Sequence, residues 1–182
     1  MATRTISKTL FSAPIWRQNN DSTWDGINSD YVNTFKTYGC SLCALTMLTA
    51  CMEGSTTLKP ATLVNRGATA QTSPEIVNYN VSNHFTLTDD GTVANNNNYY
   101  IQKIAKAIIE DDVPVFIQVP GHAVVACGFR GTVTTNVNGL PVYSTVLPSH
   151  IRFYDPYKGN YDHDLEGLVA KYGNIKRIRY PA

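Results

Sequence analysis

Residues 40–53 read CSLCALTMLTACME and, wound as a helix, they are apolar on nearly every side. A helix of this kind has no face suited to water, so it belongs in the interior of the protein. Gly54 follows it directly, and glycine is the residue type that most often ends a helix. The segment therefore predicts a buried helix that begins at Cys40, directly after Gly39.

The sequence on either side of this helix indicates what surrounds it. Residues 11–38 are rich in Asn, Asp, Ser and aromatic residues with little periodicity, which predicts an extended or irregular segment. A short helix is predicted at 59–64, with Pro60 in its first turn. A longer helix is predicted at 99–110, with the asparagine run 95–98 as its cap.

After residue 112 the pattern changes to that of β-strands. Val113–Val119 and His122–Phe129 are rich in apolar and β-branched residues, and the turn signal Pro120-Gly121 separates them. Further strands are predicted at 142–147, 151–154 and 175–180, with a short helix at 165–172. Helices first and an antiparallel sheet afterwards predict an α+β fold.

Length and composition favour a single globular domain over residues 1–182. The sequence has no internal repeat and no long linker, and 43% of its 182 residues are hydrophobic, which is enough for a buried core. The net charge is +1 without a run of basic residues. Neither nucleic acid nor an anionic membrane surface is therefore expected as a partner.

The N-terminus and the cysteines bear on the cellular compartment. No stretch approaches the ~18 apolar residues of a membrane span. Residues 1–10 carry two basic residues but no apolar segment behind them, so we expect synthesis in the cytoplasm without a secretory signal. Cys40, Cys43 and Cys51 share one predicted helix and Cys127 lies in a predicted strand, which favours reduced thiols over two disulfides.

Cys40 is the first candidate for chemistry. A cysteine at the start of a helix meets free N–H groups and the positive end of the helix dipole. Both favour the thiolate and lower its pKa from ~8.5 toward the ~3.5–7.5 of reactive cysteines. Gly39 is expected to let the backbone turn tightly and to leave room for a substrate. The alternative is a buried structural cysteine, which is common in an apolar segment.

A histidine and an aspartate follow Cys40 in settings that suit catalysis. His122 comes directly after Pro120-Gly121 and begins an apolar strand, from which it could enter a cleft and accept a thiol proton. Asp155 follows the predicted strand 151–154 and could bind the imidazole N–H and stabilise the imidazolium. The alternatives are a hydrogen-bonded structural histidine and an Asp-Pro turn. The other histidines are expected at the surface: His84, His150 and His163.

The spacing Cys40-Ser41-Leu42-Cys43 is also a CxxC, a pattern found in zinc sites and in thiol-disulfide redox proteins. A structural zinc site normally needs a second pair of ligands, and the sequence contains no other CxxC or CxxH. A thioredoxin-like redox pair needs a strand directly before the cysteines, and residues 19–38 do not supply one. Cys43 is expected to be a packing residue, and no metal or cofactor is expected.

Five motifs in one order resemble the C39-like peptidases of the papain-like superfamily. The motifs are Gln18 with Trp24, Gly39-Cys40 with Thr46-Met47, Val113-Pro114-Val115, His122-Ala123-Val124-Val125, and Tyr154-Asp155-Pro156. They span roughly residues 14–160. The chain departs from the family pattern after the cysteine, where it has Ser41-Leu42 in place of Gly-Pro.

The resemblance implies a papain-like fold, in which an N-terminal helical part with the nucleophile helix packs on a C-terminal antiparallel sheet. It implies that Cys40 is the nucleophile, His122 the base and Asp155 the residue that orients the base. Gln18, otherwise a polar loop residue, would be the oxyanion donor together with the N–H of Cys40. Gln118 is expected to point to solvent or to a neighbouring residue.

The expected function is a thiol hydrolase that cleaves a peptide or isopeptide amide in a peptide, a protein or the peptide part of peptidoglycan. The amide-rich, weakly charged composition fits a viral or cell-wall-directed protein, either virion-associated or released. The alternatives are a non-catalytic binding or structural module on the same fold and a CxxC thiol-disulfide redox protein.

Overall fold

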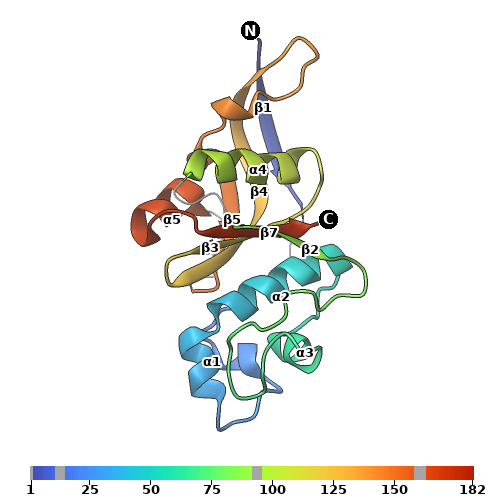
Figure 1. The fold of residues 1–182 in the computed structure, drawn as a ribbon, viewed down its shortest axis with the longest axis vertical. Coiled ribbons are helices and arrows are strands. Elements are labelled where there is room, and N and C mark those ends of the chain that lie inside the picture. Colours follow the sequence, from blue (N-terminus) through green and yellow to red (C-terminus); the bar gives the residue numbers. More distant parts are fainter. Residues whose placement is uncertain (1, 11–14, 92–95, 158–162) are drawn as a thin grey trace.

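The structure is a computed structural model and describes residues 2–10, 15–91, 96–157 and 163–182. These residues have an α+β fold in which helices surround one antiparallel sheet (Figure 1). Its helices are α1 (Val32–Tyr38), α2 (Cys40–Glu53), α3 (Pro60–Asn65), α4 (Asn97–Ile109) and α5 (Leu165–Tyr172). Short 3-10 helices lie at η1 (Asp21–Trp24), η2 (Tyr143–Thr145) and η3 (Pro148–His150).

The sheet of the described residues contains seven strands. Six of them lie side by side in the order β2-β7-β3-β4-β5-β6, and β1 pairs with the far half of β4. The strands are β1 (Ala2–Thr9), β2 (Leu87–Asp90), β3 (Val115–Val119), β4 (His122–Thr135), β5 (Ile151–Tyr154), β6 (His163–Asp164) and β7 (Arg177–Pro181). The start of β4 and the end of β5 lie at the same end of the sheet, since the two strands are antiparallel.

The core has two layers because helices cover both faces of the central strands. Alternate residues of β4, such as Val125 and Cys127, pack toward α2, while Val124 and Ala126 pack in the cluster that contains α4. Figure 1 shows α1, α2 and α3 together below the sheet and α4 across its other side. A strand buried on both faces has no polar alternation, which explains why β3 and the first half of β4 are continuous apolar runs.

Most of the predicted elements are confirmed. The helix at 40–53 has the predicted bounds, and Gly54 ends it in the left-handed conformation at φ 63°. The helices at 59–64, 99–110 and 165–172, the strands at 113–119, 151–154 and 175–180 and the turn at Pro120-Gly121 are present with small shifts. Asn96 caps α4 by accepting a hydrogen bond from the N–H of Tyr99, whereas Asn95 lies outside the described residues.

Three expectations about the elements are wrong. Residues 142–147 form no strand but contain η2, because the Thr145 hydroxyl and the Val142 N–H bond back to Thr134. The segment at 11–38 is not irregular throughout, since it holds η1 and α1. The sheet does not simply follow the helices, because β1 and β2 come before α4, and β1 extends β4 beyond the predicted end at Phe129.

Candidate active site

Cys40 is the first residue of α2, and Gly39 alone separates it from the end of α1. The N–H of Gly39 bonds to the carbonyl of Phe35, and its own carbonyl accepts from Cys43. A Cβ on Gly39 would collide with that Phe35 carbonyl and with the ring of Trp24. Gly39 is therefore needed for close packing of the junction beneath the cysteine. The expectation that it leaves room for a substrate is wrong, because protein atoms fill that space.

This packing yields a stability prediction. Gly39→Ala should lower the free energy of unfolding by about 1–3 kcal/mol, the usual cost of overpacking a rigid site. Gly167 is a matched control in α5, where a Cβ would lie 3.7 Å from the Asp164 carboxylate and meet nothing closer. Gly167→Ala should raise the free energy of unfolding by about 0.5–1 kcal/mol. Urea unfolding monitored by circular dichroism measures both, and a neutral Gly39→Ala would contradict the packing argument.

His122 and Asp155 meet at the end of the sheet where β4 begins and β5 has just ended. The Nε2 atom of His122 lies 2.8 Å from Oδ1 of Asp155, and both side chains are almost fully buried. An ionised carboxylate can only accept hydrogen bonds, so Nε2 carries the proton. The same Oδ1 accepts the backbone N–H of Tyr157 at 2.7 Å, which holds the carboxylate in place. Nδ1 is the ring nitrogen left for Cys40.

The Cys40 thiol lies close enough to the His122 ring for each to shift the pKa of the other, so the three predicted residues meet at one site. The backbone N–H of Ala123 and the side chain of Ser41 also lower the pKa of Cys40. Cys40 is partly exposed, in contrast to the fully buried Cys43 one turn later. The arrangement gives a thiol that solvent can reach and three neighbouring groups that favour its anion.

These contacts shift both titrations in the direction of an ion pair. Burial raises the pKa of Cys40, but the hydrogen bond and charge of His122, with Ala123 and Ser41, lower it overall from its ordinary value. Burial lowers the pKa of His122, whereas its bonds to Asp155 and Cys40 raise it to about 9. The lowered pKa of Cys40 and the raised pKa of His122 both favour the thiolate–imidazolium pair over the neutral pair.

Gln18 lies at the same site, but its amide is engaged with α1. Its Nε2 donates to the carbonyls of Lys36 and Thr37 at 3.2 and 3.3 Å, a few residues before Cys40. Its main chain is fixed on both sides, by the Pro156 carbonyl and by the Trp24 ring N–H. Its buried Oε1 has no hydrogen-bond partner among the described residues. Both bonds of Nε2 are long for N–H···O contacts, and an oxyanion would compete with these two carbonyls for the amide hydrogens.

Three groups at the site were not found from the sequence. The Tyr172 ring stacks on the His122 ring at 4.6 Å between centroids and 23° between planes, and the Lys171 ammonium lies over Tyr172. The other two are the Ser41 side chain and the Ala123 N–H. Tyr172 ends a predicted helix 50 positions after His122, and no local pattern marks it as a neighbour.

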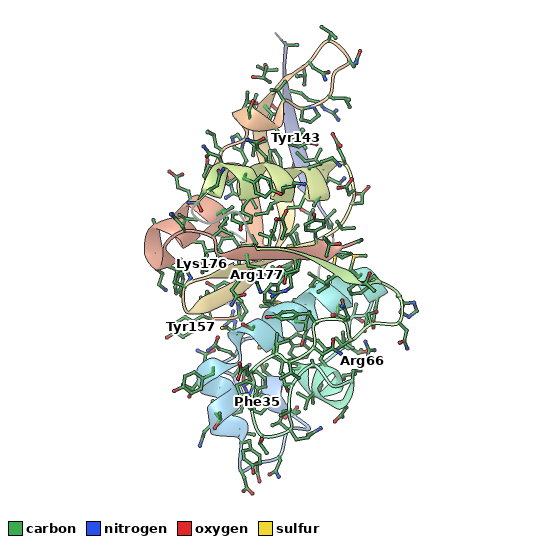
Figure 2. The ribbon with its side chains drawn as sticks, viewed as in Figure 1. Phe35, Arg66, Tyr143, Tyr157, Lys176 and Arg177 are labelled. Carbon is green, nitrogen blue, oxygen red and sulfur yellow. The ribbon has the colours of Figure 1, made fainter. Side chains whose placement is uncertain are left out.

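Figure 2 shows Tyr157, which follows Asp155 closely, at the boundary of sheet and helices where α2 begins.

A cleft of about 510 Å³ opens next to Cys40, although neither Cys40 nor His122 is among the residues that line it. It lies between the α1–α2 junction, the loop at 73–79 and the end of β3, and it is lined by Thr34, Tyr38, Ser41, Ser73, Pro74, Glu75, Ile76, Tyr79 and Gln118. Tyr38 and Ser41 flank Cys40 in the chain, and Gln118 pairs with Ala123. The expectation that Gln118 points to a neighbouring residue is confirmed, since its Oε1 accepts a bond from Arg179 of β7 at 3.5 Å, and Gln118 also lines this cleft.

The remaining cysteines and histidines lie apart from this site. Burial raises the pKa of Cys51 to about 11 and raises those of Cys43 and Cys127 further above their ordinary range. All four cysteines are free thiols. His84 is exposed, His150 packs against Phe129, and the side chain of His163 lies outside the described part of the chain. No group of three His, Cys, Asp or Glu side chains suited to a metal ion occurs among the described residues.

Comparison of the sequence with models of known protein families gives no match, and comparison with curated proteins gives none either. Within the described ranges, no helix is both long and apolar enough to cross a membrane.

Proposed function

We propose that the protein is a thiol hydrolase of papain-like architecture, similar to the C39-like peptidases, that cleaves peptide or isopeptide amides. The observation that carries this proposal is that Cys40, at the start of α2, lies beside a His122 ring that is held by Asp155 at 2.8 Å, at the end of the sheet. Buried ion pairs of this kind are costly to maintain, and perturbed titrations of a cysteine and a histidine in a cleft are typical of catalytic sites.

The reaction follows from the contacts. The Cys40 thiolate attacks the amide carbonyl, and a C–S bond forms as the carbonyl electrons move to oxygen. The backbone N–H of Cys40 and the Gln18 amide stabilise that oxyanion. His122 then gives its proton to the leaving amine as the C–N bond breaks. Water, deprotonated by His122, attacks the thioester and releases the acid and the thiol.

Asp155 acts through His122 and has no contact with the substrate in this scheme. Its carboxylate keeps the proton on Nε2, so that Nδ1 exchanges the proton with sulfur and with the leaving amine. Tyr172 covers one face of the imidazole and limits the rotation of the ring. Both residues are positioning residues.

The experiment that tests the proposal searches for Cys40-dependent release of amines. The protein is incubated with peptide mixtures from proteins and from peptidoglycan, and new α- and ε-amines are labelled and identified by mass spectrometry. We expect new amines with the wild type and none with Cys40→Ala. Cys51→Ala is the matched control, since it removes a partly exposed thiol from the same helix. A product pattern that survives Cys40→Ala would contradict the proposal.

The alternatives have different signatures in the same samples. A non-catalytic module would release no amines although it folds normally. A CxxC redox protein would form a Cys40–Cys43 disulfide under mild oxidation, and it has no use for the carboxylate that holds His122.

A further inference from the structure

The cleft beside Cys40 has one charged lining residue, Glu75, on the loop at 73–79. Its side chain is exposed, and it takes part in none of the ion pairs or side-chain hydrogen bonds of the described residues. The rest of the lining consists of hydroxyl and amide groups, two tyrosine rings, Pro74 and Ile76. The lining itself therefore carries one formal charge, which is negative.

Cations near this wall have ion-pair partners of their own. Arg179 is buried, and its guanidinium is held by Asp89 at 3.1 Å and stacked on the Tyr79 ring at 3.7 Å. Lys36 on α1 is paired with Asp21 at 2.7 Å. Asp89 also pairs with Arg177 at 3.3 Å, so the two arginines and their shared carboxylate carry a net charge of +1 on the β7 side of the cleft. Glu75 lies on the loop at 73–79 and has no ion pair with either arginine.

The loop that carries Glu75 has a defined conformation. Thr69 and Ile76 form a β-bridge, and the N–H of Val77 bonds to the carbonyl of Ala68. The N–H of Glu75 itself bonds to the Ser73 hydroxyl at 3.3 Å. A loop whose backbone is fixed holds the Cα of Glu75 at a constant place beside Cys40, so no loop ordering is needed when a charge binds there.

The two tyrosines that line the cleft add a second preference for cationic groups. The side chain of Tyr38 is 69% exposed although it is large and aromatic, and it lies two residues before Cys40. An exposed aromatic face attracts ammonium and guanidinium groups through its quadrupole. Tyr79 forms the opposite part of the lining, and Arg179 fixes its ring from behind.

We infer that the cleft selects substrates with a lysine or arginine side chain close to the scissile amide, and that Glu75 is the specificity-determining residue. This inference rests on the proposed hydrolase function and names the substrate class for it. The cationic head group would pair with Glu75 and lie against Tyr38, while its apolar stem would cross the cleft wall near Ile76.

The test uses peptides that share one cleaved sequence and differ in carrying Lys, Gln or Glu at each position near the scissile bond. At one position, the wild type should cleave the Lys peptide about fivefold faster than the Gln peptide in kcat/KM, the size expected for a partly exposed ion pair. Glu75→Gln should remove this preference, and Glu75→Lys should reverse it. Glu166→Lys, the same charge change at an exposed position of α5, should leave it intact.

A second measurement needs no substrate. Cationic and anionic methanethiosulfonate reagents react with the Cys40 thiolate, and the ratio of their rates reports the charge of the cleft. Glu75→Lys should lower the cationic-to-anionic ratio about fivefold or more, and Glu166→Lys should not change it.

The possible results distinguish a failure of the selectivity inference from a failure of the proposed hydrolase function. Cleavage at equal rates for Lys, Gln and Glu at every position overturns the inference and leaves the hydrolase function standing. A Lys preference that persists in Glu75→Gln also overturns it. If no peptide is cleaved and Cys40 reacts as an ordinary thiol, the proposed function fails, and the selectivity inference fails with it. A reagent ratio unaffected by Glu75→Lys overturns the inference without any substrate.

Discussion

His122→Ala is expected to slow the reaction of Cys40 with iodoacetamide at pH 6.5 by about 100-fold, because an ordinary thiol is only about 1% ionised at that pH. In the wild type the imidazolium lowers the pKa of Cys40 against the opposing effect of burial. Without the ring, burial remains and only the Ala123 N–H and the Ser41 side chain favour the thiolate. Amide hydrolysis should fall by about 1,000-fold or more, since the variant loses its proton donor as well.

The measurement is alkylation of each cysteine against pH, mapped by mass spectrometry. In the wild type Cys40 should react selectively below pH 7, while Cys51, whose pKa is raised to about 11, should not. His84→Ala removes an exposed histidine of the 81–86 segment and serves as the control, with no change in Cys40 labelling. Equal labelling of Cys40 in wild type and His122→Ala at pH 6.5 would show that the imidazole does not activate the thiol.

The parts of the fold that could be predicted are those with strong local signals. α2 was predicted to the residue because it is apolar all round and bounded by Gly39 and Gly54. β1 was not predicted, because Ile6 is its one buried position and its strand character depends on pairing with β4, more than 100 residues away in the sequence. Likewise, the sequence of α1 has little periodicity, since Phe35 is its one buried residue.

The same distinction applies to the candidate site. Cys40, His122 and Asp155 each stand at an element boundary that the sequence marks, so their positions could be predicted and the structure brings them together. The orientation of the Gln18 amide toward α1 could not be predicted, because it depends on carbonyls that only the folded chain places there. The stacking of Tyr172 on His122 depends on how α5 packs, and no local pattern encodes it.

Substitution of Asp155 is expected to lower kcat/KM strongly as well, and two substitutions separate the effect of its charge from that of its hydrogen bond. Burial lowers the pKa of His122, and Asp155 is the first group that opposes it and brings the pKa to about 9. Asp155→Ala removes both the charge and the acceptor, so Nε2 loses its partner in a buried place. Asp155→Asn keeps an oxygen for Nε2 and for the Tyr157 N–H, and removes the charge alone.

The pH dependence of kcat/KM should respond in a definite direction. In the wild type the acid limb reports the lowered pKa of Cys40 and the alkaline limb the pKa of His122, near 9. Loss of the carboxylate disfavours the imidazolium, so the alkaline limb should move to lower pH. It also reduces the population of the His122 imidazolium, which stabilises the Cys40 thiolate, so the acid limb should move to higher pH. The active range should therefore narrow from both sides.

The two variants should differ in the size of the loss. At pH 7.5 Asp155→Ala should lower kcat/KM by about 100-fold, at the lower end of what general acid–base catalysis contributes. Asp155→Asn should lose less, because in the thiolate–imidazolium state both ring nitrogens carry protons and the amide oxygen can still accept from Nε2. Asp30→Asn removes an exposed carboxylate ahead of α1 and is the control. Suppose that Asp155→Asn and Asp155→Ala lower kcat/KM equally and leave both limbs of the pH profile at their wild-type positions. Asp155 then neither orients His122 nor stabilises its imidazolium, and the catalytic unit consists of Cys40 and His122 alone.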